Sequence, residues 1–403
     1  ITVALFLNLP LELRMLCVGL LGLLVAGQIN RGIYRLAWNP RLIGPWAAPD
    51  PQVDRRHWSD RLPVMGWWWL RRESPVHGRT FWVRPLLLEL LVPLCWMALY
   101  WWIVQGQQAP GVIPTATGLH AQWCSHVVLI SFMLMATFID LDEQMIPDEI
   151  TVPGTLIGMV MASVLPTGAL PTAGGSPLRV TSPNPWLPEL DGTTGLVVGL
   201  VCLGGWCLAL LPKTWWTRQG PGRAIRFLIA SMLKPRLLWC LFGMALIWLL
   251  AVWTLGDEPW RALLSSLVGL AFGGSLVWAV RIVAGAALGK EAMGFGDVTL
   301  MAMIGTYVGW QSSFIVFFIA PFAGIFVAVG QWLLIRRNDL AYGPYLCLAT
   351  VVLIVAWRPV WNGWGAVMFS IGWLVPAVVL LCIGLMFLML LVWRLFCWLL
   401  FRG

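Results

Sequence analysis

The chain has 403 residues, of which 59% are hydrophobic and 11% are charged, and its mean hydropathy is +0.81. In soluble domains roughly a quarter of residues are charged, so this composition excludes a soluble protein and indicates a polytopic membrane protein. The net charge of +8 does not indicate nucleic-acid binding, because the basic residues fall in short loops between apolar runs.

Apolar segments follow one another along the whole chain, and several reach or approach the ~20 residues that a membrane helix needs, whereas those at 150–165, 298–309 and 344–357 are short for a full span. The predicted fold class is therefore all-α, a polytopic membrane helix bundle of about 9–11 membrane segments with a small loop domain after the first. In chain order the segments run near 13–33, 86–104, 123–140, 150–165, 193–211, 237–255, 262–285, 298–309, 312–335, 344–357 and 366–393.

Basic residues predict how these segments are oriented. The loop at 35–85 carries nine arginines, and the loop at 212–236 carries six lysines or arginines. By the positive-inside rule both loops are cytoplasmic and the N-terminus is outside. The order of segments then brings Asp140 and Asp297 to the same cytoplasmic face. The Pro- and Gly-rich stretch 166–192 is expected to be an exposed external loop.

Five carboxylates gather between residues 138 and 151. Asp140 directly follows a continuous apolar run, where a carboxylate is costly and calls for a function. Asp142 is expected at a solvated helix end. Pro147 suits the first turn of the next helix, and Asp148 with its neighbour Glu149 would favour the positive end of that helix.

A second acidic site is the sequence Gly294-Phe295-Gly296-Asp297. The two glycines permit an unusual backbone path and the close approach of another chain. Two carboxylates on one membrane face do not both ionise readily, so one keeps its proton while the other activates a water. This is the chemistry of an aspartic protease, although the sequence does not say which aspartate starts protonated.

No other kind of catalysis is indicated. The nine cysteines form no Cys-x-x-Cys pair, so neither a zinc site nor a disulfide framework is predicted. The four histidines lack metal-ligand spacing, and no serine or cysteine triad is visible.

These motifs resemble the type IV prepilin peptidases. Ile139-Asp140-Leu141-Asp142 followed by Ile146-Pro147-Asp148 looks like the family's first aspartate motif, and Gly289-Lys290-Glu291 through Asp297 is similar to the second. Tyr342-Gly343-Pro344-Tyr345 resembles a further signature, and Asn30, Arg84 and Glu89 follow the family's cytoplasmic region.

The resemblance implies an aspartic endopeptidase of the inner (cytoplasmic) membrane. It would remove the basic leader from type IV prepilin or pseudopilin precursors, including pseudopilins of type II secretion, at the cytoplasmic face. Asp140 and Asp297 take the two catalytic positions, and Gly294, Gly296, Asp142, Pro147, Asp148 and Lys290 are the supporting or substrate-binding residues. The expected partners are these precursors and membrane lipid, and no nucleic acid.

The resemblance also divides the chain. Residues 1–34 are the first membrane segment, 35–85 a cytoplasmic basic loop domain, and 86–403 the membrane peptidase domain, with an insertion near 166–256. Family members usually carry zinc-binding Cys-x-x-Cys pairs in the first loop, but residues 35–85 contain no cysteine. We therefore expect no zinc, and the use of S-adenosylmethionine for N-methylation is in doubt.

Two other functions remain open at this point. One is a non-catalytic homologue that binds pilin-type helices, against which the two intact aspartates argue. The other is a proton-coupled transporter, although such carriers place their acidic residues nearer the midplane than a loop edge.

Overall fold

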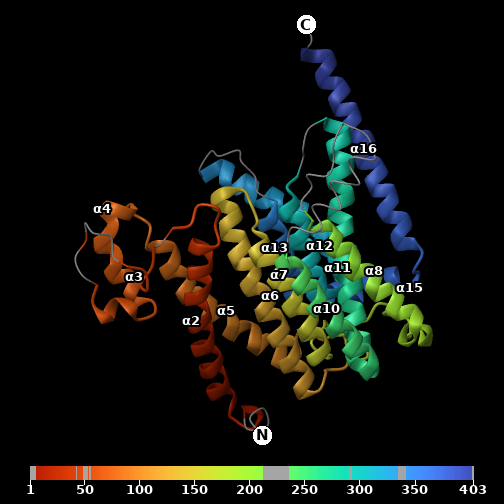
Figure 1. The fold of residues 1–403 in the computed structure, drawn as a ribbon, viewed down its shortest axis with the longest axis horizontal. Helices are drawn as coiled ribbons and strands as arrows, with labels where there is room; N and C mark the ends of the chain where they lie inside the picture. Colours follow the sequence, from red (N-terminus) through yellow and green to blue (C-terminus); the bar gives the residue numbers. More distant parts are fainter. Residues whose placement is uncertain are drawn as a thin grey trace.

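The structure is a computed structural model that describes residues 6–41, 43–48, 53, 56–211, 236–289, 293–334 and 342–401. Within these ranges the chain forms helices and loops but no extended strand (Figure 1). The prediction of an all-α, polytopic membrane protein is confirmed. The elements in chain order are α2 (Leu11–Arg35), η1 (Trp58–Arg61), α3 (Met65–Leu70), η2 (Arg71–Glu73), α4 (Ser74–His77), α5 (Val83–Val104), α6 (Ala116–Glu143), α7 (Asp148–Val164), η3 (Pro188–Asp191), α8 (Thr193–Ala209), α10 (Arg236–Leu255), α11 (Asp257–Leu288), α12 (Phe295–Leu334), α13 (Gly343–Val355), α14 (Trp357–Val360), η5 (Trp361–Gly365), α15 (Ala366–Ser370) and α16 (Leu374–Phe401).

Seven helices of the described chain are long and apolar enough to cross a membrane, or eight if a bent pair counts as one span. They are α2, α5, α6, α10, α11, α12 and α16, and the bent pair joins 343–355 to 357–370. This number is smaller than the predicted 9–11 because the apolar helices α7 and α8 have 17 residues each. A helix of this length rises roughly 25 Å, less than the hydrocarbon thickness.

α12 joins two segments that the sequence separates. Apolar runs at 298–309 and 312–335 predict two helices, but the structure has one element from Phe295 to Leu334. The helix breaks inside this element at Gly309, whose φ of 81° is non-helical. A glycine adopts such a φ without the steric cost that a β-carbon brings.

α11 and α12 form the closest helix pair in the bundle. A β-carbon built on Gly269 would collide with the carbonyl oxygen of Gly305, and one built on Gly273 would lie 2.6 Å from the carbonyl oxygen of Met301. Small residues allow backbones to approach this closely, and lipid offers no hydrophobic drive that could replace such packing. The pair anchors the start of α12, where Asp297 lies.

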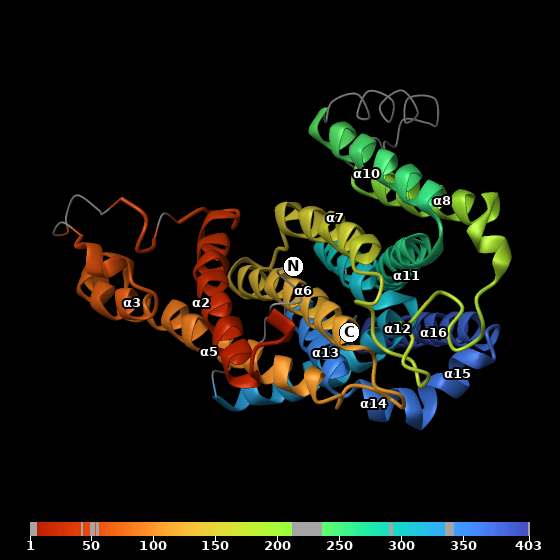
Figure 2. The same ribbon diagram turned by 90° about the horizontal axis from the view of Figure 1, so that it is seen from below.

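The basic loop after α2 folds into short helices on one side of the bundle (Figures 1 and 2). Its small core contains Tyr34, Trp67 and Leu70, with Trp67 2% exposed. Glu73 is buried and accepts hydrogen bonds from Nε and Nη2 of Arg56 at 3.0 and 2.8 Å. The predicted loop domain is therefore ordered by aromatic packing and by a buried ion pair.

The stretch 166–192 is less exposed than the sequence predicts. Leu170 and Leu178 are almost fully buried, and Arg179 is 9% exposed. Arg179 Nη2 bonds to the carboxylate of Glu258 at 2.6 Å and to the Pro166 carbonyl at 3.0 Å. Proline and glycine content marks a loop correctly, but it does not reveal which of its side chains fold back onto the helices.

α8 and α10 pair with each other and with α11 on the outside of the bundle (Figure 2). They form a second apolar cluster with residues of α11 such as Trp260, Leu263 and Leu267. The larger cluster, which includes Ile139, Ile146 and Val298, surrounds the acidic residues. α8 and α10 therefore pack in a different apolar cluster from the one around the acidic site.

Candidate active site

Asp140 and Asp297 line one cavity of about 420 Å³. Asp140 comes from the last turn of α6, and Asp297 comes from the first turn of α12. Both are buried, at 5% and 8% exposed. Although 157 residues separate them in the sequence, the fold brings the two carboxylates to the same space.

One carboxylate oxygen of Asp140, Oδ2, faces the backbone of Gly343, where a β-carbon would lie 2.6 Å from it. This oxygen is buried and has no hydrogen-bond partner among the described residues. A buried carboxylate oxygen without a partner is costly, and an acidic side chain kept at such a cost beside a membrane helix indicates a function. α6 ends at Glu143, one turn after Asp140, because Gln144 adopts a left-handed conformation (φ 53°) and returns its N–H to the Asp140 carbonyl at 2.8 Å.

Gly296, the residue before Asp297, lets the backbone of α12 approach Ile146 closely. A β-carbon built on Gly296 would lie 2.9 Å from Cβ of Ile146, and one on Gly343 would lie 2.8 Å from Cδ1 of Ile146. Three chain segments thus meet around one buried isoleucine. Gly294 lines the cavity, and a β-carbon there would lie 3.7 Å from Asp297 Oδ2. Neither Gly294 nor Gly296 has a positive φ. The two glycines therefore allow the predicted close approach of another segment, but neither adopts a left-handed backbone conformation.

Asp142 is exposed at the end of α6, as the sequence predicts, and both Asp142 and Glu143 are bonded to the basic loop domain. Arg84 Nη1 donates to both oxygens of Asp142 at 2.8 Å, and the guanidinium lies over the rings of Tyr34 and Phe138. Glu143 accepts the backbone N–H groups of residues 38 and 39 at 2.7 and 3.1 Å. The end of α6 is therefore attached to the basic loop, and Asp142 supports this attachment without lining the cavity.

The structure does not place the other predicted site residues beside the two aspartates. Pro147 is buried and stands one residue before α7, which begins at Asp148, so the predicted helix start holds to within one residue. Asp148 and Glu149 lie in the first turn of α7, as expected from their charge. None of the three lines the cavity with the two aspartates. Lys290 lies outside the described residues.

Several cavity residues were not predicted from the sequence as part of the site. Tyr342 lines the cavity just before α13. Burial, together with the nearby Asp297 carboxylate, raises the pKa of Tyr342, so its hydroxyl keeps its proton and can donate a hydrogen bond. Tyr342 stands in a motif that the sequence did single out, which was the available signal. Gln144, Met145, Met293 and Phe295 complete the wall.

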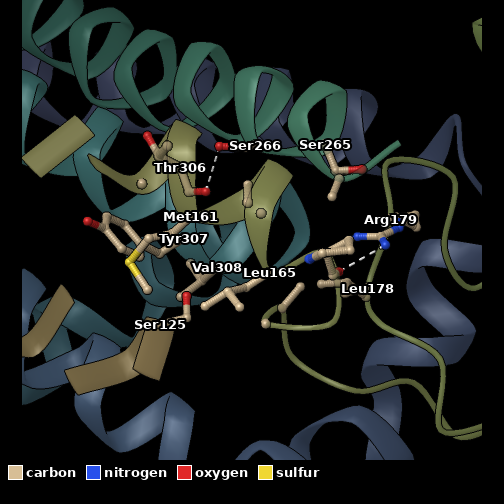
Figure 3. Close-up of a pocket in the computed structure, with 17 residues that line it drawn as sticks. Ser125, Met161, Leu165, Leu178, Arg179, Ser265, Ser266, Thr306, Tyr307 and Val308 are labelled. Atoms are coloured by element: carbon tan, nitrogen blue, oxygen red, sulfur yellow. Dashed lines mark hydrogen bonds between the residues drawn. The ribbon is translucent and has the colours of Figure 1, made fainter. Parts of the chain in front are cut away.

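A second cavity lies between α6, α7, α11, α12 and the 166–192 loop (Figure 3). Its volume is about 30 Å³, which corresponds to roughly one water molecule. Ser266 Oγ donates to the Thr306 carbonyl at 2.8 Å in its wall. This cavity is too small for a peptide, so it is not a second active site.

The donor set of the described residues does not fit a bound metal. No group of three or more His, Cys, Asp or Glu side chains is arranged for an ion in the described ranges, and the loop at 35–85 has no cysteine. A structural zinc site needs about four such ligands. No step of the chemistry below involves a metal.

Comparison with known proteins points to one family. Residues 228–329, which include Asp297, match the model of the type IV leader peptidase family. A Pectobacterium carotovorum protein is 23% identical over 83% of this chain and 90% of its own length. An Aeromonas hydrophila protein is 31% identical over 43% of this chain and 59% of its own length. Both are named prepilin leader peptidase/N-methyltransferase.

The matched residues make this chain similar to the type IV leader peptidase family. A relative from Escherichia coli K12 with the same name is 32% identical over 23% of this chain and 43% of its own length. No solved structure matches this chain. The resemblance seen in the motifs is confirmed, and the apolar helices are those of a multi-pass membrane protein.

Proposed function

We propose that this protein is an intramembrane aspartic endopeptidase that removes the leader from type IV prepilin or pseudopilin precursors. The observation that carries the proposal is the shared cavity, which is lined by two buried carboxylates, one of them with an unpartnered oxygen. The family match supports the substrate class, and the relatives' names contain the same activity.

In this mechanism the two aspartates share one proton, because two close carboxylates do not both ionise readily. The ionised carboxylate takes a proton from a water, whose oxygen attacks the carbonyl carbon of the scissile bond. The protonated carboxyl donates a hydrogen bond to the carbonyl oxygen, and a proton then passes to the leaving nitrogen as the C–N bond breaks. No covalent intermediate forms.

The attachment of the site to the basic loop supports a cytoplasmic position for it. Asp142 is paired with Arg84, and Glu143 is bonded to residues 38 and 39 just after α2. The end of α6 therefore shares a face with the arginine-rich stretch 31–84. Since arginine-rich loops stay on the cytoplasmic side, we propose that the active site faces the cytoplasm from the inner membrane.

We further propose that residues 86–403 form the peptidase domain, with an insertion near 166–256. In support, α8 and α10 pack on α11 in a cluster apart from the aspartates. Neither zinc nor S-adenosylmethionine is required for cleavage in this proposal. Methyl transfer is left as a doubtful second activity, although the relatives' names include it.

Co-expression with a prepilin tests the proposal. Asp140→Asn and Asp297→Asn are each expected to lower leader removal by roughly 10²–10⁴-fold, because each removes one member of a general acid–base pair. Leader removal is followed by electrophoretic mobility at matched membrane levels of enzyme. Glu149→Gln is the control, since this exposed carboxylate of α7 does not line the cavity, and it should cleave normally.

Full cleavage by either asparagine variant would exclude that aspartate from the mechanism. A wild-type protein that binds prepilin and leaves the leader attached would instead identify a non-catalytic pilin-binding homologue.

A further inference from the structure

Another cavity, different from the one in Figure 3, lies away from the two aspartates, between α2, the basic loop domain and α5. Its volume is about 290 Å³. One stripe of α2 forms a wall of this cavity, and each of its residues lies three or four positions from another of them: Leu24, Gly27, Gln28, Arg31 and Arg35. Residues at this spacing share one face of a helix, so the wall passes from apolar to cationic along the helix axis.

The cationic end is dense in arginine. Arg31, Arg35, Arg41 and Arg61 all line the cavity. None of the four has a carboxylate partner within the part of the chain that the structure describes, and the Arg61 guanidinium lies over the ring of Trp46, 5.2 Å from its centroid. Four guanidinium groups around one space attract an anion, and guanidinium matches the geometry of a phosphate.

The floor of the cavity is lined by hydrogen-bond acceptors instead of cations. Glu89 is 5% exposed and accepts N–H groups from Val64 (2.6 Å), Trp67 (2.9 Å) and the Asn30 amide (3.4 Å), and it has no cationic partner among the described residues. Asn30 is 2% exposed, and its Oδ1 has no hydrogen-bond partner. A β-carbon on Gly27 would be 3.8 Å from Glu89 Oε1, so the glycine leaves this side of the carboxylate open.

These acceptors call for a donor that carries positive charge. A buried carboxylate without a cation is costly, and an unpartnered amide oxygen adds to that cost. A primary ammonium group supplies three N–H donors and one positive charge. The cavity is thus suited to a ligand that holds an anionic group and an ammonium group a few atoms apart.

The apolar end of the cavity leads to the membrane. Leu23 and Leu24 line it there, and Leu24 is 65% exposed on the outer surface of α2. Seven residues separate Leu24 from Arg31, a rise of about 10 Å along a helix. The ligand therefore has an apolar part that points along α2 away from the arginines.

We propose that this cavity binds the headgroup of a phospholipid that carries a primary amine, such as phosphatidylethanolamine. The phosphate lies among the arginines, the ammonium group bonds to Asn30 Oδ1 and Glu89, and the acyl chains follow the leucines of α2. Basic pockets beside membrane helices bind lipid headgroups in this way. The site is independent of the two aspartates, so its test does not depend on peptidase activity.

Native mass spectrometry of the delipidated full-length chain measures the binding. Phosphatidylethanolamine, phosphatidylcholine and phosphatidylglycerol with identical acyl chains are offered at equal concentration. We expect preference for the ethanolamine lipid, because a trimethylated amine has no N–H to donate and glycerol carries no positive charge. Free phosphoethanolamine, which lacks the acyl chains, should bind more weakly than the lipid.

The double variant Arg31→Ala/Arg35→Ala should weaken binding of the ethanolamine lipid by about tenfold or more. Both side chains are exposed, so the fold should persist, and circular dichroism verifies this. Arg79→Ala is the matched control, because this exposed arginine of the same loop domain does not line the cavity.

Equal retention of the three lipids would overturn the proposal, as would equal binding by the double variant and the Arg79→Ala control. Retention of phosphoethanolamine as strong as that of the lipid would assign the site to a free phosphate compound. Saturable binding of S-adenosylmethionine that displaces the lipid would assign the cavity to an amino-acid-like ligand and would likewise refute the lipid site.

Discussion

Gly343 shows how closely the backbone approaches the candidate catalytic groups. A β-carbon at this position would lie 2.6 Å from Asp140 Oδ2 and 2.8 Å from Cδ1 of Ile146. Contacts this short force a neighbour to move, and Ile146 is held between chain segments on both sides. The backbone at residue 343 therefore determines where the Asp140 carboxylate points.

Gly343→Ala is predicted to reduce leader removal by at least about tenfold, since a displacement of ~1 Å in a catalytic group can cost more than that. Cleavage of co-expressed prepilin at matched enzyme levels measures the effect. Gly363→Ala is the control, because a β-carbon there meets nothing within 4 Å. Equal activity of the two variants would show that Asp140 tolerates the added methyl group.

At the scale of elements, the contact between α11 and α12 keeps Asp297 in place. Gly269 and Gly305 pack backbone against backbone, and Gly273 is close to the Met301 carbonyl. On α12 these contacts lie roughly one to two helical turns from Asp297 and from the break at Gly309, so they position the whole first half of α12.

Gly269→Ala is predicted to destabilise the protein by about 1–3 kcal/mol, the usual cost of overpacking a tight contact. The loss appears as a lower midpoint of thermal unfolding in detergent. Gly243→Ala in α10 is the matched helical control, since a β-carbon there meets nothing within 4 Å, and it should leave the midpoint unchanged or raise it. A Gly269→Ala midpoint equal to that of Gly243→Ala would contradict the close packing.

The basic loop domain is predicted to loosen in acid through Asp60. Burial by itself would raise the pKa of Asp60, but hydrogen bonds from Arg72 and from the His57 N–H together hold it below the ordinary value of 3.8. A depressed pKa in the folded state means that ionised Asp60 adds stability above the ordinary pKa. That stability is lost as the pH falls through the lower, folded value.

Hydrogen exchange of residues 56–77, followed from about pH 6 to about pH 3 and corrected for the intrinsic rate, should show protection falling at the acid end. Asp60→Asn, which cannot ionise, should have lower protection at pH 6 and a smaller decrease in acid. A variant with the same pH profile as the wild type would show that another carboxylate governs the loop.

At the scale of the whole molecule, the two loops occupy opposite ends of the bundle. The basic loop is joined to the end of α6 through Glu143, and the 166–192 stretch follows the far end of α7. The predicted topology therefore places the basic loop in the cytoplasm and the Pro- and Gly-rich stretch outside.

Epitope tags at Gly78 and Gly174 test this arrangement, because a β-carbon at either position meets nothing within 4 Å. In intact spheroplasts an external protease should remove the tag at Gly174 and spare the tag at Gly78, which becomes accessible only after lysis. The reverse pattern would place both aspartates on the outer face.

Composition and local pattern were sufficient for the broad architecture. Apolar runs of helical length identify most helices, since the membrane requires nearly every backbone group to bond within its own helix. The local sequence pattern did not predict the structure at positions where contacts with distant segments determine it. Gly309 lies between two apolar runs, and only tertiary packing shows that a single bent element contains both. Arg179 lies in a loop-like sequence, yet it is buried against Glu258.

The sequence by itself determined the class of protein, the two candidate aspartates and the resemblance to one family, because these depend on hydropathy and on residues within short motifs. Only the tertiary structure decided that Asp140 and Asp297 share a cavity, that Tyr342 borders it, and that Asp142 pairs with Arg84 instead. It also brought Asn30 and Glu89 together with arginines of the basic loop domain. The physical reason is that burial and pairing depend on segments distant in the chain, which no local pattern encodes.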